Sequence, residues 1–228
     1  MKKIQEYFEM ALQNEDDEKL NKFAVQLSAL DKELGGINPE EKLNLGDLKR
    51  MARFQNMMED YERAIITGKA EEDLAKLQAK AAPLAPKDFN FAEFRRRFQL
   101  QRVFQEYYRA VTGKGGESKS EELAKKLETT SSDDAEALND MAWTLLTDEK
   151  IQHRNLKLAL KLAQAAVDAS DGKDFSAVDT FARALFDTGK LAEAVKQQKR
   201  ALELCDNKDK KPELQTTLKK YEEKASTK

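Results

Sequence analysis

The stretch DFSAVDTFARALFDTGKLAEAVKQQKRALEL, residues 174–204, decides the fold. In its first half Val178, Phe181 and Leu185 recur at intervals of three or four residues, and its second half has a similar apolar pattern. This spacing places apolar side chains on one face of an α-helix. The tetrapeptide Asp-Thr-Gly-Lys at 187–190 interrupts the pattern. We therefore predict two amphipathic helices joined by a short turn.

Small side chains stand where these two helices would cross closely. Ala182 lies in the first helix, and Ala194 and Ala201 lie seven residues apart in the second. A second copy lies upstream, because 137–146 aligns with 177–186 at an offset of 40 and 156–166 aligns with 191–201 at an offset of 35. The difference, 40 − 35 = 5 residues, predicts an insertion around 150–154 in the turn of the upstream copy. A single helical hairpin cannot bury its own apolar face, so we expect the two copies to stack.

The two hairpins, over residues 135–204, resemble the tetratricopeptide repeat (TPR), a helix–turn–helix unit of about 34 residues. More narrowly, they look like the TPR tails that follow thioredoxin-like domains in some bacterial proteins, although the CxxC motif of that family is absent here. The resemblance implies an all-α, right-handed solenoid, for which we expect ten to eleven helices. An ordinary Ala-rich helical bundle is the alternative fold.

The rest of the chain extends this pattern in both directions. Residues 1–133 predict a divergent helical-hairpin region, in which the segments around Arg63 and Arg109 repeat at an offset of 46 and are each followed by Thr-Gly-Lys. Residues 134–228 contain the TPR-like pair and a polar helix at 212–225. Such a helix is expected to cap the last apolar face of a solenoid.

The composition limits the classes of function. The 228 residues carry a net charge of −2, so no overall positive field attracts nucleic acid or an anionic membrane. No apolar run is long enough for a membrane span or a signal peptide, and we expect a soluble protein of undetermined compartment and oligomeric state. The single cysteine excludes an intramolecular disulfide.

No arrangement of residues predicts catalysis, and we expect no metal and no cofactor. His153 is the only histidine and falls in the inserted turn, where we expect it to be exposed. Cys205 falls on an apolar helix face, where we expect a buried and unreactive thiol. The glycine-rich segment 112–116 lacks the spacing of a phosphate-binding loop.

One alternative function rests on the helix predicted for residues 90–111. Arg95, Arg102 and Arg109 recur every seven residues near several phenylalanines, which is the one feature compatible with nucleic-acid binding. A solvated helix face is the favoured interpretation, because the chain is not basic overall.

The favoured function is a non-catalytic scaffold that binds a protein or peptide. The TPR resemblance implies a concave surface formed by the first helix of each hairpin. By register, the residues facing it are Asn139, Trp143, Leu146, Asp179, Arg183 and Phe186.

TPR domains that bind a terminal carboxylate have Lys and Asn at the first two such places. Asp179 and Arg183 depart from that pattern, which argues against a carboxylate clamp. We expect the ligand to place an apolar side chain against Trp143 and an acidic side chain near Arg183. Two alternatives remain open: Trp143 packs against the preceding helices, or the chain is the accessory region of a larger thioredoxin-like redox enzyme.

Overall fold

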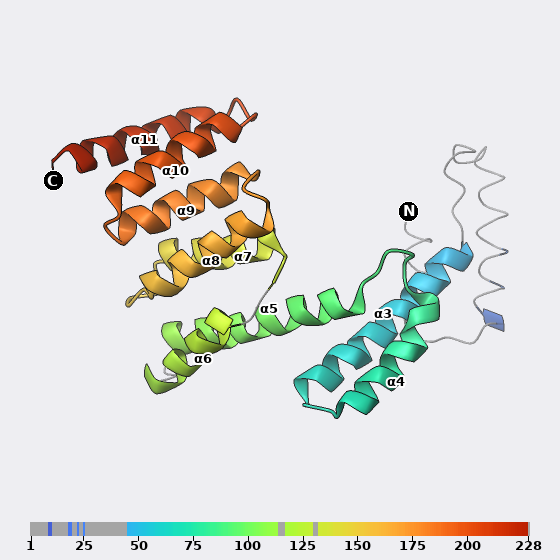
Figure 1. Ribbon diagram of the computed structural model, residues 1–228. Helices are drawn as coiled ribbons and strands as arrows, with labels where there is room; N and C mark the ends of the chain where they lie inside the picture. The colour runs from blue at the N-terminus through green and yellow to red at the C-terminus, as the bar shows by residue number, and fades with distance from the viewer. Residues whose placement is uncertain are drawn as a thin grey trace. The chain divides into compact units, whose positions relative to one another are not determined.

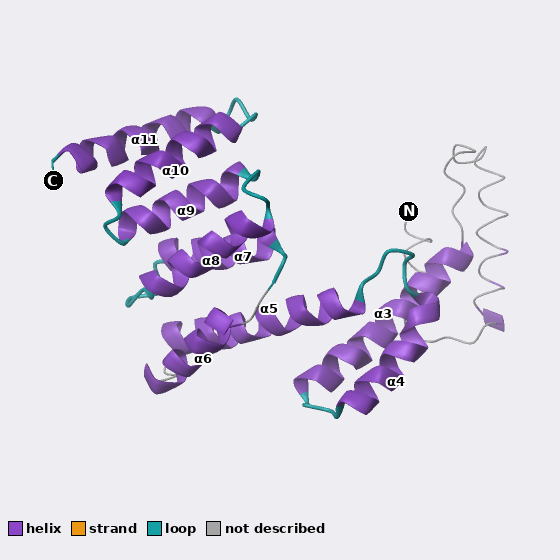
Figure 2. Cartoon of the chain, viewed as in Figure 1, coloured by secondary structure: helices purple, strands orange, loops and turns teal. Residues whose placement is uncertain are grey.

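The computed structural model describes residues 45–113, 117–129 and 132–227, together with residues 9, 10, 18, 19, 22 and 25. All regular secondary structure in these residues is helical, which confirms the all-α class (Figures 1 and 2). The described part contains nine α-helices, α3 to α11, and one short 3-10 helix, η2, against the ten to eleven helices expected for the whole chain. The part of the predicted helical-hairpin region that precedes residue 45 lies almost wholly outside the described residues.

The chain divides into two compact units, Met1–Phe91 and Ala92–Lys228. The expected division lay between residues 133 and 134 instead. Helices α5 (Phe91–Thr112) and α6 (Glu117–Thr129) group with the second unit because their apolar side chains share one core with α7 to α10. The units are described separately below.

In the first unit, α3 (Leu45–Ile66) packs against α4 (Glu71–Ala81) and η2 (Ala82–Leu84). Most apolar side chains of α3 lie inward. Met51 is an exception: 52% of its surface is exposed, whereas its neighbour Ala52 is fully buried. Consecutive helical residues point about 100° apart. The buried face of α3 therefore passes through the small residue Ala52 and leaves Met51 on the solvent side.

Aromatic rings join α3 to the chain that follows η2. The ring of Phe54 meets those of Phe89 and Phe91 edge to face, with centroids 4.9 and 6.3 Å away. Tyr61 meets Phe91 in the same way at 6.1 Å. Edge-to-face pairs at these separations are favourable, so this aromatic cluster fixes the end of the first unit against α3.

The second unit contains α5 and α6, followed by two helical hairpins and a last helix. Helix α7 (Ala135–Thr147) packs on α8 (Leu156–Ala169), and α9 (Phe175–Asp187) packs on α10 (Leu191–Leu204). Helix α8 also packs on α9, and α10 packs on α11 (Lys211–Ser226), so neighbouring helices lie side by side (Figure 1). The four helices predicted within residues 135–204 are confirmed.

Alanines allow these helices to approach one another closely. The alanines predicted at the helix crossing, Ala182, Ala194 and Ala201, are fully buried, and so are their counterparts in the upstream copy, Ala159 and Ala166. A methyl side chain keeps two backbones near, and the leucines and valines around it fill the remaining space. The alanine spacing in the sequence therefore identified the contact surfaces correctly.

Side chains that accept backbone hydrogen bonds set where the helices begin. Asp134 Oδ1 accepts from the Ala137 amide at 3.0 Å, and Asn155 Oδ1 accepts from the Leu158 amide at 2.9 Å. Each satisfies one of the amides that a helix leaves unpaired in its first turn. The turn between α9 and α10 uses Gly189, whose φ of 80° suits glycine.

Polar contacts place α5 along α7. Near the start of both helices, Arg97 Nε lies 2.8 Å from Asp134 Oδ2. Near the end of both helices, the Tyr108 hydroxyl donates to Asp148 Oδ2 at 2.7 Å. Because the N-terminal ends of α5 and α7 are joined by one contact and their C-terminal ends by the other, the two helices run parallel. Helix α7 in turn contacts α9, so the first helix of each hairpin lies beside the first helix of the next.

The inserted residues between α7 and α8 form an ordered connection. Ile151 is buried, and Arg154 Nη2 donates to the Asp148 carbonyl at 3.3 Å. The Lys150 amide donates to Asp148 Oδ1 at 2.8 Å. His153 is exposed, as expected. The insertion is therefore held to the end of α7, close to the Tyr108 contact with α5.

Candidate protein-binding face

The six predicted contact residues lie at equivalent places on two neighbouring helices. Asn139, Trp143 and Leu146 are on α7, and Asp179, Arg183 and Phe186 are on α9. The two helices contact each other, so the fold brings the two sets together. Two of the six, however, are covered by other parts of the second unit.

Leu146 and Phe186 do not line an open surface. Leu146 is 1% exposed and belongs to the hydrophobic core, which corrects its prediction as a ligand contact. Phe186 is half-buried, and its ring stacks on Tyr221 of α11 with centroids 4.3 Å apart and planes 16° apart. Lys220 Nζ also lies 5.7 Å from the Phe186 ring. Register within a helix predicts its apolar positions, but not which neighbouring helix covers them.

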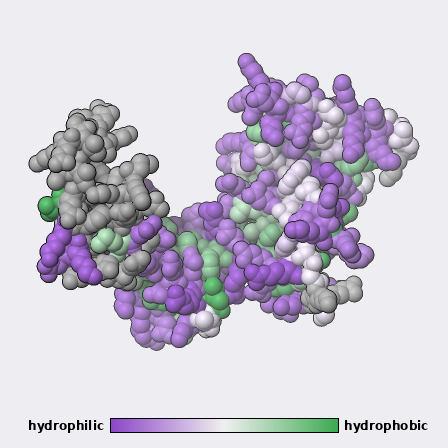
Figure 3. Space-filling view, turned by 180° about the vertical axis from the view of Figure 1, so that it is seen from behind, coloured by the Kyte–Doolittle hydropathy of each residue, from purple (hydrophilic) through white to green (hydrophobic). Residues whose placement is uncertain are grey.

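Trp143 is the prominent apolar side chain of this face. It is 44% exposed, and no other large apolar side chain among the described residues of the second unit is as open. In the view of Figure 3 the described residues present a mainly hydrophilic surface. The structure therefore does not bury Trp143 among the preceding helices, which was the alternative placement.

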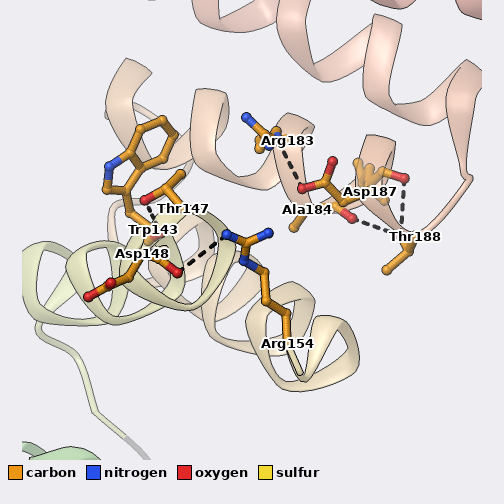
Figure 4. A network of polar contacts seen from close by, with 9 residues as sticks. Trp143, Thr147, Asp148, Arg154, Arg183, Ala184, Asp187 and Thr188 are labelled. Atoms are coloured by element: carbon orange, nitrogen blue, oxygen red, sulfur yellow. Dashed lines mark hydrogen bonds and ion pairs between the residues drawn. The ribbon is translucent and has the colours of Figure 1, made fainter. Parts of the chain in front are cut away.

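Arg183 is already engaged by an acidic neighbour. Its Nε lies 2.8 Å from Asp187 Oδ2, one helical turn further along α9 (Figure 4). The two side chains are partly exposed, and the pair neutralises the charge of the guanidinium locally. Arg183 was the reason to expect an acidic group in the ligand, and this ion pair removes that reason.

Arg154 is a residue of this region that the sequence did not indicate. In the view of Figure 4 its guanidinium lies between the C-terminal ends of α7 and α9, where it donates to the Asp148 carbonyl. Helix C-termini attract cations because their last carbonyls are unpaired. Helical periodicity carries no information about a loop side chain, so only the folded structure could reveal this position.

Asp179 and Gln198 form a polar pair between α9 and α10. Gln198 is fully buried, and its Nε2 donates to Asp179 Oδ1 at 2.7 Å. Burial raises the pKa of the Asp179 carboxyl, and Glu213 adds to this, while the Gln198 hydrogen bond and the positive charges of Arg183 and Lys210 oppose it. The side-chain oxygen of Gln198 has no hydrogen-bond partner within the described structure.

The other features singled out in the sequence also have a place in the structure. Cys205 is fully buried, and its thiol donates to the Asn207 carbonyl at 3.4 Å. Within 45–113, 117–129 and 132–227, no group of three His, Cys, Asp or Glu side chains could hold a metal ion. On α5, Arg102 Nε is buried and lies 3.9 Å from Glu106 Oε1.

None of the described helices is long and apolar enough to cross a membrane. Compared with models of protein families, with curated proteins and with solved structures, the chain has no significant match in any of the three.

Proposed function

We propose that this chain is a non-catalytic scaffold whose helical hairpins form a TPR-like, right-handed solenoid and bind a segment of a partner protein. The first helices α5, α7 and α9 are placed side by side, and α11 covers the last of them at Phe186. This order agrees with a stack of hairpins closed by a capping helix. The binding face in this proposal is formed by α7 and α9.

The observation that carries the proposal is the exposure of Trp143. Tryptophan is among the residues that most often dominate protein interfaces, because it buries a large apolar area on binding. Here it stands 44% exposed on a helix whose inward side is tightly packed with Leu and Ala. Holding an indole in water serves no packing purpose, whereas it provides an anchor for a partner.

The test begins with capture of the partner from an extract of the source cells, followed by titration of the purified partner. Trp143 is the only tryptophan, so its fluorescence reports directly on this face. We expect Trp143→Ala to weaken binding by about 1–3 kcal/mol, or about 5- to 150-fold, while the helical spectrum is retained.

Ile66→Ala is the matched control, because Ile66 is 55% exposed on α3 in the first unit. It should leave the affinity unchanged. A captured partner that binds Trp143→Ala as tightly as the unmodified chain would contradict the proposed face.

A further inference from the structure

We infer that α11 detaches reversibly from the second unit, and that the surface it leaves binds an amphipathic helix of a partner in its place. The inference rests on the proposed function, since this surface includes the α9 part of the proposed binding face. Three observations carry it: which side chains α11 covers, how few side chains hold it there, and which polar groups its docking leaves unsatisfied.

Helix α11 covers side chains of α9 that were expected to face a ligand. At one end, the Tyr221 ring stacks on Phe186 with centroids 4.3 Å apart. At the other end, Gln198 Nε2 lies 2.7 Å from Asp179 Oδ1 and 3.5 Å from the Leu214 carbonyl of α11. We call the surface formed by Asp179, Phe186 and Gln198 the α11 site.

The two helices of the proposed binding face therefore differ in accessibility. On α7, Trp143 is 44% exposed. On α9, the charges of Arg183 and Asp187 act on the hydroxyl of the buried Tyr221, so α11 lies close to these residues as well. A partner that uses both helices has to displace α11.

Few side chains hold α11 in place. It buries only Leu214 and Tyr221, whereas α9 buries seven side chains. The ion pair between Lys199 Nζ and Glu222 Oε1, 2.8 Å apart, joins α10 to α11, but both side chains are about half exposed and such pairs contribute little. Elements with few buried apolar contacts open at a lower free energy than the core. As the last helix of the unit, α11 can leave without separating the hairpins before it (Figure 1).

The docking of α11 also carries a polar cost. Gln198 is fully buried, and its Oε1 has no hydrogen-bond partner within the described structure, although buried acceptors are nearly always paired. Burial raises the pKa of the Asp179 carboxyl, and the charge of Glu213 on α11 raises it further. Water reaches both groups once α11 has left, so these costs favour its release.

The way α11 binds indicates what replaces it. Leu214 and Tyr221 are seven residues apart, two helical turns, and so lie on one face of the helix. A partner helix with an aliphatic and an aromatic residue at this spacing fits the α11 site, with its ring against Phe186. A side chain that also donates a hydrogen bond to Gln198 Oε1 would give it an advantage that α11 lacks.

The test uses a fluorescently labelled synthetic peptide of residues 208–227, which carries this pattern, titrated against the full chain by fluorescence anisotropy. The apparent affinity of a site is reduced by the fraction of time that it is free. Because Tyr221→Ala loosens α11, we expect this variant to bind the peptide about tenfold or more tightly than the unmodified chain. Tyr221→Phe keeps the ring and is the matched control, which should bind like the unmodified chain. Adding Phe186→Ala to Tyr221→Ala should abolish the gain.

Native hydrogen exchange measures the release itself. In the unmodified chain, the amides of α11 should exchange at least about tenfold faster than those of α9. Equal protection of the two helices would overturn the inference, as would peptide binding that is absent from Tyr221→Ala or equally tight in both chains. Unfolding of the whole second unit by Tyr221→Ala, seen by circular dichroism, would show that α11 is a required part of the core and would overturn it too. None of these measurements uses Trp143, so a negative result leaves the test of the proposed function intact.

Discussion

Gly172 and Arg200 form a contact that glycine alone permits. Gly172 has a φ of 66°, and its carbonyl accepts a hydrogen bond from Arg200 Nη2 at 2.7 Å. A Cβ at this position would lie 2.0 Å from that nitrogen. We expect Gly172→Ala to lower the free energy of unfolding by about 1–3 kcal/mol, through the left-handed backbone and the lost hydrogen bond.

Gly189→Ala is the control that measures the cost of the left-handed backbone alone. The free energy of unfolding of both variants is measured by urea denaturation. Gly189 has a φ of 80°, but a Cβ there would have no neighbour within 4 Å. In an Arg200→Ala background the two alanine variants should become equally destabilising. A difference that persists in that background would show that Arg200 is not its cause.

Asp179 predicts a pH dependence of stability. Because burial raises the pKa of its carboxyl in the folded state above the ordinary value of 3.8, the folded chain binds this proton more readily than the unfolded chain. Its favourable contribution is therefore fully present below 3.8 and is lost as the pH rises through the folded-state pKa. Relative to Asp179→Asn, the unmodified chain should gain stability on acidification through this window, measured by urea denaturation at a series of pH values.

The carboxyl of Asp148 should make stability depend on pH in the opposite direction, and it serves as a control. The hydroxyl of Tyr108 and the amide of Lys150 lower the pKa of the Asp148 carboxyl below its ordinary value. Its contribution is present above 3.8 and is lost on acidification. A stability difference between the unmodified chain and Asp179→Asn that is independent of pH would contradict the Asp179 prediction.

Cys205 gives a direct measure of burial at the end of α10. Its thiol is free and fully buried, so a thiol reagent should label it slowly in the native protein and quickly in denaturant. The labelling time course is followed by mass spectrometry. Fast labelling under native conditions would mean that the end of α10 opens readily.

At the scale of the helices, a substitution at Ala182 tests how closely α9 and α10 approach each other. A leucine at this fully buried position has no space, and such overpacking costs about 1–3 kcal/mol. We expect Ala182→Leu to lower the midpoint of thermal unfolding. Ala192→Leu, at an exposed position of α10, is the matched control and should leave the midpoint nearly unchanged.

Helical elements were predictable because apolar spacing and small residues are local properties of the sequence. The hairpins of residues 135–204 and their buried alanines follow from them directly. The partners of each helix do not: Leu146 was expected to face a ligand and lies in the core. The hydrogen bond between Gln198 and Asp179 was missed for a similar reason, since Gln198 reaches Asp179 from another helix.

The whole molecule consists of two compact units whose boundary falls at the start of α5. No local pattern marks this boundary, because α5 has the same amphipathic character as the helices on either side. Only the shared core shows that α5 and α6 belong with α7 to α10. This is why the division expected at residue 133 differs from the division at Phe91.

A fragment comprising residues 90–228 should fold independently, because it contains the complete core of the second unit. We expect it to be helical by circular dichroism and to unfold in a single transition reported by Trp143 fluorescence. A fragment starting at residue 134, which lacks α5 and α6, should be less stable. Equal stability of the two fragments would show that α5 and α6 contribute little to this core.

The pairing of each helix with close neighbours in the chain also has a consequence for how the protein acquires its structure. In the second unit the main contacts join helices that are adjacent or next but one. Chains with such local contacts fold in microseconds to milliseconds, whereas ribosomes add about 5–20 residues per second. Each new helix therefore has time to pack on the helices that precede it before the next one has been synthesised.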